Sequence, residues 1–447
     1  MAGDALPENW RLSTLGEVAD PKSKAIVSGP FGSNIGSRFF VKQGVPVIRG
    51  NNLTTDMTRF VDDGFVFVTE AKADELGNCG AVIDDLIFTA AGSLGQVGII
   101  PRAAKYPRYI ISNKQLRARI DKSKVDPLFA FYWFSSREMV EYVKQRNTGS
   151  SVPLINLSVL RSLPLPLPPL AEQRAVAHIL GTLDDKIELN RRMNETLEAM
   201  ARALFKSWFV DFDPVRAKVE GRAPGLPKRL ADLFPDSFED SELGEIPKGW
   251  EVGTLADFAS LNPESWSKQT RPEIIKYVDL SNTKWGHIEA VTGYAQQDAP
   301  SRAQRVLRQD DTIVGTVRPG NGSYAFISVD GLTGSTGFAV LRPRRTEYAQ
   351  FIYLAATIAE NIEALAHLAD GGAYPAVRPE VVIATQVVRP SDQVLERFSM
   401  LNGSFFARMA ENELESRNLV ALRDSLLPKL ISGELRVKDA EKIVEPA

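Results

Sequence analysis

The sequence repeats itself, and this internal repeat constrains the fold more than any other feature. Landmarks of the first half return in order in the second: Pro7, Trp10, Thr14, Leu15 and Ala19 recur as Pro247, Trp250, Thr254, Leu255 and Ala259. Further pairs are Asp84-Asp85 with Asp310-Asp311, residues 127–136 with 347–356, and loop 148–156 with 370–378, which aligns Pro153 with Pro375. An ordered series of this kind indicates a duplication, with loops that vary on a shared scaffold.

Short β-rich runs alternate with helical stretches within each half. In the first half, residues 45–50, 64–69, 85–90 and 96–101 predict strands, because they are bounded by Gly, Asn and Asp. Residues 127–146 predict a helix. We therefore expect a mixed α/β (α+β) fold class, with two pseudo-symmetric modules that each contain a curved sheet and long loops.

Two long helical patterns share one heptad frame. From Val176 to Trp208 the seam residues follow an unbroken 4-3 spacing, which is typical of a coiled coil. Adding 222 to each position gives a second seam from Phe398 to Leu430, with fewer apolar residues. The expected segments are a first module at 1–165, a first helix at 166–212, a linker at 213–245, a second module at 246–390, a second helix at 391–435 and a tail at 436–447.

The two seams are expected to pack against each other. Because one helix follows each module, a pseudo-two-fold axis would pair them antiparallel. The polar seam residues Asn190 and Asn412 coincide under the offset, and a buried Asn fixes register at a cost in stability. The seam residues singled out are Leu183, Ile187, Asn190, Leu197, Leu204, Phe405, Met409, Asn412, Leu419 and Leu426. The alternative is that each helix packs only on its own module.

Charge is segregated along the chain although the net charge is only −3. Residues 102–124 hold eight basic residues and one acid, whereas residues 231–245 hold six acids and no basic residue. Either block can be a solvated surface. The single cysteine suits a reducing compartment, and neither a signal-peptide pattern nor an apolar membrane span is evident. We therefore expect a cytoplasmic protein without a membrane segment.

The motifs of several enzyme classes are missing from the sequence. Asn262-Pro263-Glu264 is not the Asn/Asp-Pro-Pro-aromatic motif that holds a flipped adenine, and no phosphate-binding GxxxxGK[ST] loop occurs. The histidines His178, His287 and His367, together with one cysteine, lack metal-ligand spacing. We expect no catalytic residue, metal site or cofactor in this chain.

Four segments carry a family resemblance. Residues 166–215, which include SWFVDFDPV, together with residues 225–250, the SGPFGSNI loop at 28–35, and residues 419–435 resemble the specificity subunits of type I restriction–modification systems. The resemblance extends over essentially the whole chain. In the second module nothing matches GPFGS, which leaves its contact residues open.

This resemblance implies a non-catalytic, DNA-binding role in defence against foreign DNA. The modules would be target-recognition domains that each read one part of a bipartite site in double-stranded DNA. The helices, as an antiparallel coiled coil, would separate them and dock two adenine-N6 methyltransferase (M) subunits, and restriction/translocase (R) subunits would join for cleavage. S-adenosylmethionine is expected in the M subunit, with no cofactor in this chain. The paired helices would then set the gap between half-sites.

Residues that would contact DNA are chosen for their chemistry. Lys and Arg suit phosphates, whereas Asn, Arg and Ser suit base edges. In the first module the candidates are Ser28, Gly29, Phe31, Gly32, Ser33, Arg49, Asn51, Asn52, Arg102, Lys105, Arg108, Lys114, Ser150 and Ser151. In the second module they are Arg302, Arg305, Arg318, Asn321, Ser323, Tyr324, Tyr374 and Arg378. The Gly-rich segment 318–324 is the strongest single candidate.

Three other functions stay open at this point. The chain could serve as the specificity subunit of another modification or defence system, which neighbouring genes would reveal. It could instead be a protein–protein scaffold, which tight, salt-sensitive binding to duplex DNA would exclude. An enzyme comes last, because no catalytic constellation is visible.

Overall fold

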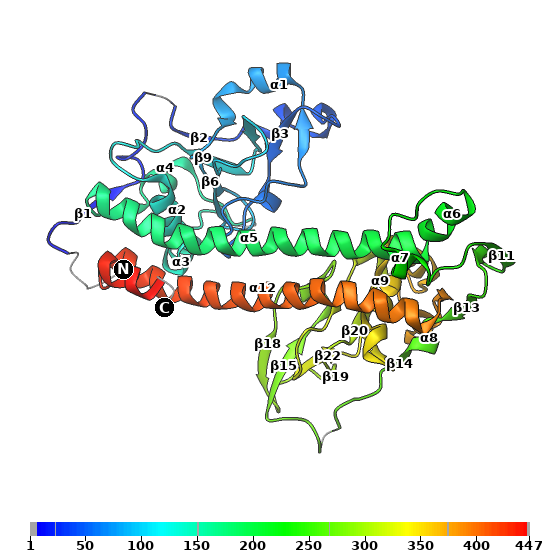
Figure 1. Ribbon diagram of the computed structural model, residues 1–447. Helices are drawn as coiled ribbons and strands as arrows, with labels where there is room; N and C mark the ends of the chain where they lie inside the picture. Colours follow the sequence, from blue (N-terminus) through cyan, green and yellow to red (C-terminus); the bar gives the residue numbers. More distant parts are fainter. Residues whose placement is uncertain (1–6, 23, 150–151, 268, 373–374, 445–447) are drawn as a thin grey trace. The chain divides into compact units, whose positions relative to one another are not determined.

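The computed structural model describes residues 7–22, 24–149, 152–267, 269–372 and 375–444. The chain divides into two compact units: unit 1 comprises 1–189 with 415–447, and unit 2 comprises 190–414. Two long helices, α5 (Leu170–Phe209) and α12 (Asp392–Ser432), contribute a part to each unit (Figure 1). The described residues include no helix that is long and apolar enough to cross a membrane.

Unit 1 contains the first module, built on two four-stranded sheets and a strand pair. One sheet has the order β2-β9-β6-β7, the other has the order β4-β3-β8-β5, and β1 pairs with β10. The strands are β1 (Arg11–Thr14), β2 (Ile26–Ser28), β3 (Val45–Ile48), β4 (Val66–Val68), β5 (Gly80–Ala81), β6 (Leu86–Thr89), β7 (Val97–Ile99), β8 (Tyr109–Ile111), β9 (Gln115–Ala118) and β10 (Pro164–Leu167). The helices are α1 (Glu70–Glu75), α2 (Pro127–Ser135), α3 (Arg137–Gln145) and α4 (Leu157–Arg161).

Unit 2 repeats this topology strand for strand. Its sheets have the orders β14-β23-β20-β21 and β18-β15-β22-β19, and β13 pairs with β24. The strands are β13 (Glu251–Thr254), β14 (Ala259–Leu261), β15 (Ile274–Val278), β18 (Thr292–Ala295), β19 (Ala303–Leu307), β20 (Thr312–Gly315), β21 (Tyr324–Phe326), β22 (Leu332–Ser335), β23 (Phe338–Pro343) and β24 (Gln386–Arg389). The helices are α8 (Leu255–Phe258), α9 (Ala349–Thr357), α10 (Ala359–Leu368) and α11 (Pro379–Ile383). The parallel pair β3–β8 recurs as β15–β22, which confirms the duplication.

The aspartate landmarks of the repeat have the same structural role in both modules. Asp84 and Asp310 both adopt the left-handed conformation with φ of 70°. The next residues, Asp85 and Asp311, are buried and pair with Arg119 and Arg342 on the neighbouring strands, at 2.7 and 2.8 Å. A buried carboxylate needs such a partner, which explains why the two-residue pattern recurs.

The four strands predicted in the first module are present, whereas the predicted helix is divided. The predicted strands correspond to β3, β4, β6 and β7 within about two residues. The helix predicted over 127–146 is in fact two helices, α2 and α3. Ser136 has ψ of 147° and its side chain caps α3 by accepting a hydrogen bond from the Met139 amide, so the chain turns there.

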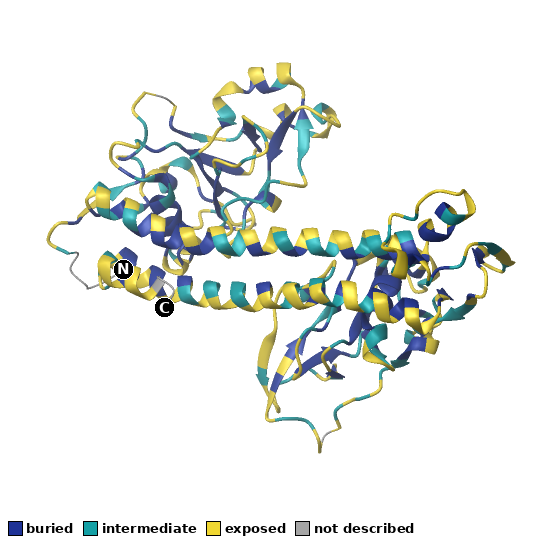
Figure 2. Cartoon of the chain, in the orientation of Figure 1, coloured by how far each residue is buried: buried dark blue, intermediate teal, exposed yellow. Residues whose placement is uncertain are grey.

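The aromatic helices α2 and α9 are buried in the cores of their modules. Buried residues also gather on the sheets and along the long helices (Figure 2). One tyrosine of each of the helices α2 and α9 contacts a long helix. The Tyr132 hydroxyl donates to Asp184 at 2.5 Å, and the Tyr353 hydroxyl donates to Glu198 at 3.1 Å. Burial raises the pKa of Tyr353 well above its usual value, so this hydroxyl remains protonated and continues to donate.

The long helices pack antiparallel in each unit, as predicted. In unit 1, Asp184 and Lys186 of α5 pair with Arg423 and Glu415 of α12 at 2.9 and 3.2 Å. In unit 2, residues later on α5 contact residues earlier on α12, for example Trp208 against Phe398 with ring centroids 5.7 Å apart. All twenty seam positions, from Val176 to Trp208 and from Phe398 to Leu430, are buried or half-buried.

A polar contact interrupts the apolar seam within unit 2. Asn190, Asn194 and Asn412 are all buried. The Asn412 side-chain amide donates to the Asn194 side-chain oxygen at 2.8 Å, and Asn190 Nδ2 donates to the Asn412 carbonyl at 3.4 Å. The predicted polar seam pair therefore exists, and Asn194 is its third member. Such contacts cost stability but disfavour shifted registers.

Two segments have more structure than the sequence indicated. The expected linker 213–245 contains α6 (Asp213–Val219), α7 (Lys228–Ala231) and β11 (Phe238–Ser241), which pairs with β12 (Gly244–Pro247). Its Phe234 is buried against Trp208, 5.0 Å between ring centroids. The expected tail contains α13 (Val437–Val444), whose Ala440 lies in the core of unit 1. Isolated apolar residues within polar segments provide these contacts, which periodicity alone did not reveal.

Candidate functional site

The loop at residues 28–33 forms an exposed edge of the first module. Ser28, Gly32 and Ser33 are exposed, and Phe31 is 81% exposed. Gly29 lies so close to the Ser112 carbonyl that a Cβ there would overlap it. The glycine thus lets this loop lie directly on the turn between β8 and β9, which carries the exposed Lys114. The close backbone approach that Gly29 permits is therefore to the protein's own chain.

Residues 49–52 have mixed roles. Asn52 is fully buried, and its side chain donates to the carbonyls of Val61 and Asp63 while accepting from the Arg49 amide. We therefore remove Asn52 from the DNA-contacting candidates, because its polar atoms hold the 61–63 loop. Asn51 is exposed, and Arg49 is half-buried and donates to the Gly64 carbonyl. These two residues stay in the candidate set.

Much of the basic run at 102–124 is neutralised within the module. Arg108 pairs with Glu70 and Asp74, Lys122 pairs with Asp84, and the buried Arg117 donates to backbone carbonyls. Arg108 is therefore already paired with two carboxylates. Arg102, Lys105 and Lys114 are exposed, and these three are the cations of the run that best suit phosphate contacts.

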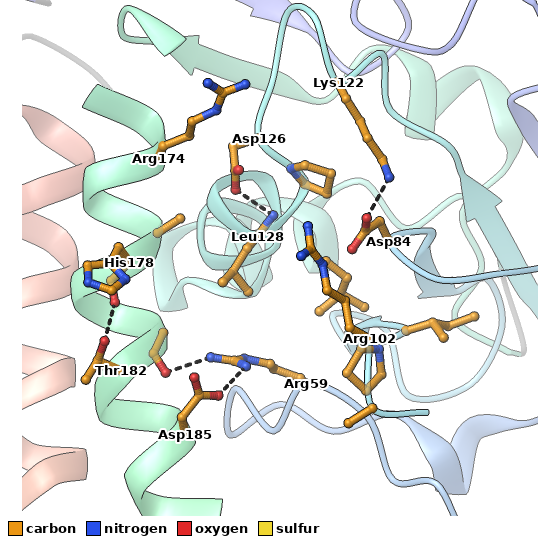
Figure 3. A pocket seen from close by; sticks show the side chains of 17 residues that line it. Arg59, Asp84, Arg102, Lys122, Asp126, Leu128, Arg174, His178, Thr182 and Asp185 are labelled. Atoms are coloured by element: carbon orange, nitrogen blue, oxygen red, sulfur yellow. Dashed lines mark hydrogen bonds and ion pairs between the residues drawn. The ribbon is translucent and has the colours of Figure 1, made fainter. Parts of the chain in front are cut away.

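A cleft of about 770 Å³ lies within unit 1 between α5 and the loops of the first module (Figure 3). Arg174 and His178 of α5 line one wall, and Arg102 lines the other. Across the cleft Arg59 donates to Asp185 at 2.7 Å and to the Gly181 carbonyl at 2.8 Å, which ties a module loop to the helix. His178 is exposed on the surface of α5.

Arg318 is held at the base of a tight loop in the second module. Its amide donates to the Pro375 carbonyl at 2.8 Å, just as the Gly92 amide donates to the Pro153 carbonyl at 2.9 Å in the first module. The predicted register of the two prolines is therefore confirmed. Arg318 takes the left-handed conformation, with φ of 48°, where the other module has a glycine with φ of 98°. An arginine in this strained position is typical of a functional site.

Two predicted contact residues of the same segment are buried instead. The Ser323 hydroxyl donates to the Leu280 carbonyl at 3.1 Å, and the Tyr324 ring is only 5% exposed. Burial raises the pKa of Tyr324. Both side chains are buried, so neither is available to contact DNA.

Other candidates of the second module have diverse environments. Arg302, Asn321 and Arg378 are exposed, and Arg302 lies 3.7 Å from the Asp279 carboxylate. Arg305 is half-buried, donates to the Ser265 hydroxyl, and has its pKa lowered by burial. The candidates that lie outside the described residues are Ser150, Ser151 and Tyr374.

Trp285 is a surface residue that no sequence pattern predicted. This residue lies between the short strands β16 (Thr283–Lys284) and β17 (His287–Ile288), and its side chain is 56% exposed. Its amide donates to the Gly322 carbonyl at 2.6 Å, which places it beside the 318–322 loop. The Trp-Gly pair in a polar run is a turn signal, but nothing in the sequence indicates that the indole is exposed.

The fold and these surfaces define a duplicated protein with two loop-bearing recognition modules. Residues 7–199 match the family described as "Type I restriction modification DNA specificity domain". This match covers the first module and most of α5, and these residues are therefore similar to a DNA specificity domain. The second module lies outside this match and has the same sheet topology as the first.

Similar proteins cover most of the chain. The type I restriction enzyme HindI specificity subunit of Haemophilus influenzae is 27% identical over 380 residues, which are 73% of this chain and 81% of that subunit. The MjaIX specificity subunit of Methanocaldococcus jannaschii is 26% identical over 97% of this chain and 95% of its own. The fold resembles a type I S subunit from M. genitalium, with a TM-score of 0.55, 17% identity, and coverage of 96% and 97%.

Proposed function

We propose that this chain is the DNA sequence-recognition subunit of a type I restriction–modification complex. Each module binds one half of a bipartite target in duplex DNA. The helices dock two M subunits, which bind S-adenosylmethionine and methylate adenine, and R subunits join for cleavage. The chain itself selects the site and takes no part in bond-making.

The observation that carries this proposal is a shared scaffold with different exposed loops. Both modules have the same strand orders, yet the first exposes the loop around Phe31 whereas the second exposes the loop around Arg318. A protein that reads two different half-sites needs this combination, because specificity depends on side chains at base edges while the scaffold only positions them.

The proposed contact set consists of polar, charged and aromatic candidates that are exposed or half-buried. In the first module it comprises Ser28, Phe31, Ser33, Arg49, Asn51, Arg102, Lys105 and Lys114, and in the second Arg302, Arg305, Arg318, Asn321 and Arg378. The side chains that suit phosphates provide affinity that falls with salt, and those that suit base edges provide discrimination.

Two similar helix surfaces support the docking of two identical partners. On α5 the exposed residues Thr196, Ala199, Met200 and Ala203 are spaced as one face, and the corresponding positions on α12 are Asn418, Ala421, Leu422 and Ser425. Identical partners need chemically similar surfaces. Most other pairs of exposed residues that are 222 positions apart on α5 and α12 differ in charge or polarity, such as Arg174 and Glu396.

Sequencing of methylated adenines on a plasmid tests the proposed function. A host that expresses this chain with its M subunit should modify one bipartite sequence, and a host with the M subunit alone should modify none. If the second module is replaced by that of a related subunit, one half of the sequence should change and the other should stay. Absence of sequence-dependent methylation by the purified complex would refute the proposal.

A further inference from the structure

Exposed aromatic side chains are rare in this protein and are distributed one to each module. In the part of the chain that the structure describes, Phe31 and Trp285 are the only exposed phenylalanine, tyrosine or tryptophan residues. Phe31 is 81% exposed and Trp285 is 56% exposed. Burial of an aromatic ring contributes a large favourable free energy, so leaving one ring in solvent in each module calls for an explanation.

Trp285 is held rigidly in its exposed position. The residue adopts φ of 48°, a conformation that L-residues rarely take. Its ring packs on Gly322, where a Cβ would lie 2.5 Å from the indole, and meets Tyr324 edge-on with centroids 6.1 Å apart. The next residue, Gly286, lies against Tyr353, where a Cβ would be 2.8 Å from the hydroxyl. Little conformational entropy is therefore left to lose when the ring binds a ligand.

The surroundings of Trp285 favour a nucleic acid as that ligand. Lys284 and His287 are exposed on either side of it, and Arg318 and Asn321 are exposed on the adjoining loop. Cations around an exposed aromatic ring are typical of surfaces that bind a phosphate backbone and stack on bases.

Phe31 has a similar setting in the first module. Its loop lies on the turn that carries the exposed Lys114, and Arg38 donates to the Ser33 carbonyl at 2.7 Å. Phe31 precedes the short 3-10 helix Gly32–Asn34, whereas Trp285 follows the 3-10 helix Leu280–Asn282. The two rings are therefore not copies of one ancestral residue, and each module acquired its own.

We propose that Trp285 and Phe31 are stacking wedges, each of which inserts its ring at a base step of the half-site that its module reads. This inference rests on the proposed function and assigns a specific mode of DNA contact to it. Insertion of an aromatic wedge unstacks one step and bends the duplex, which costs less at flexible pyrimidine–purine steps. Each wedge would then add selectivity for such a step without a hydrogen bond to a base.

The test uses the complete complex of this chain with its M subunits and a duplex that carries the sequence found by methylation mapping. Trp285→Ala should raise Kd roughly 5- to 150-fold, as expected for loss of one base–aromatic stack. Trp285→Phe should retain most of the affinity, and Ile274→Ala, which removes a side chain 70% exposed elsewhere in the module, should change nothing. If Trp285→Ala lowers the melting temperature, Trp285→Gln replaces it in the test, because the longer glutamine side chain still packs against Gly322.

A second readout reports the unstacking of one base step. 2-Aminopurine placed at successive positions of the half-site should brighten at one step in the wild-type complex, and this signal should vanish with Trp285→Gln but persist with Trp285→Phe. Phe31→Ala should remove a corresponding signal from the other half-site only. A separate signal from the adenine that the M subunit extrudes should persist in every variant.

The outcomes separate this inference from the function on which it rests. Absence of specific methylation by the wild-type complex contradicts the proposed function itself. Specific methylation together with unchanged Kd and unchanged fluorescence in Trp285→Gln leaves that function intact and overturns the wedge. Loss of M-subunit binding by Trp285→Gln without DNA present would show that the ring is a subunit contact, which also overturns it.

Discussion

At the scale of single residues, conformational strain marks one place where function and stability conflict. Arg318 holds a left-handed conformation that its counterpart Gly92 adopts without cost. The sequence shows an arginine in a Gly-rich segment, but only the shared hydrogen bond to Pro375 and to Pro153 shows that the two residues are equivalent. The side chain was retained at a position where glycine would be more stable.

Arg318→Gly should therefore stabilise the chain and weaken recognition. We expect the free energy of unfolding to rise by about 1 kcal/mol or less, because relief of the left-handed strain exceeds the added entropy of glycine. Arg318→Ala should lose the same DNA contact without this gain. Thermal melting and methylation of targets altered in one half-site provide the measurements. Equal relaxation at both half-sites in either variant would contradict the modular assignment.

At the scale of elements, the polar contact between the long helices has a measurable energetic signature. In unit 2, Asn412 donates to Asn194 inside the buried seam between the two helices. Replacing only one of the two residues would leave the other buried without this hydrogen-bond partner. That single replacement costs more free energy of unfolding than replacing both residues with apolar ones. The heptad pattern predicts Asn at the seam, but the donor and acceptor are visible only in the structure.

The variants Asn194→Leu and Asn412→Leu should each lower the free energy of unfolding by about 1–3 kcal/mol. The double variant should recover most of that loss, because both polar groups are then removed. Urea denaturation of the wild type, the two single variants and the double variant gives the interaction free energy between the two side chains. Additive losses would show that the two side chains do not interact in solution.

The proposed docking faces on the helices are a second feature at this scale. Ala199→Arg on α5 and Ala421→Arg on α12 should each reduce the number of bound M subunits from two to one, and the double variant should bind none. Both alanines are exposed, so the arginines hinder a partner without disturbing the fold. Native mass spectrometry of the complex measures the stoichiometry. Ala407→Arg is the matched control, because its counterpart Asp185 has different chemistry.

At the scale of the whole molecule, α5 and α12 are continuous helices that take part in both units. Insertion of seven residues after Leu189 and seven after Leu414 keeps the heptad frame and lengthens each helix by about 10.5 Å. The spacer between half-sites should then grow by about 3 base pairs, since base pairs rise 3.4 Å each. Both half-sites should be unchanged in methylation mapping. A changed half-site, or an unchanged spacer, would contradict the proposal that the length of the helices sets the gap between the half-sites.

The sequence by itself determined the features that depend on periodicity and order. The landmark pairs predicted two modules of one architecture, and the heptad spacing located both seams, because repeated local patterns survive in the chain whatever the tertiary fold. The predicted α/β class, the antiparallel pair and the buried Asn190 and Asn412 follow from these patterns alone.

Only the tertiary structure decided which polar and aromatic side chains face outward. Asn52, Ser323 and Tyr324 have the residue types of DNA contacts, but their partners Val61, Leu280 and Tyr353 turn them into the interior. Trp285 has the residue type of a core side chain, yet its backbone geometry and the contact with Gly322 hold it in solvent. Exposure depends on contacts between residues distant in sequence, and no local pattern encodes them.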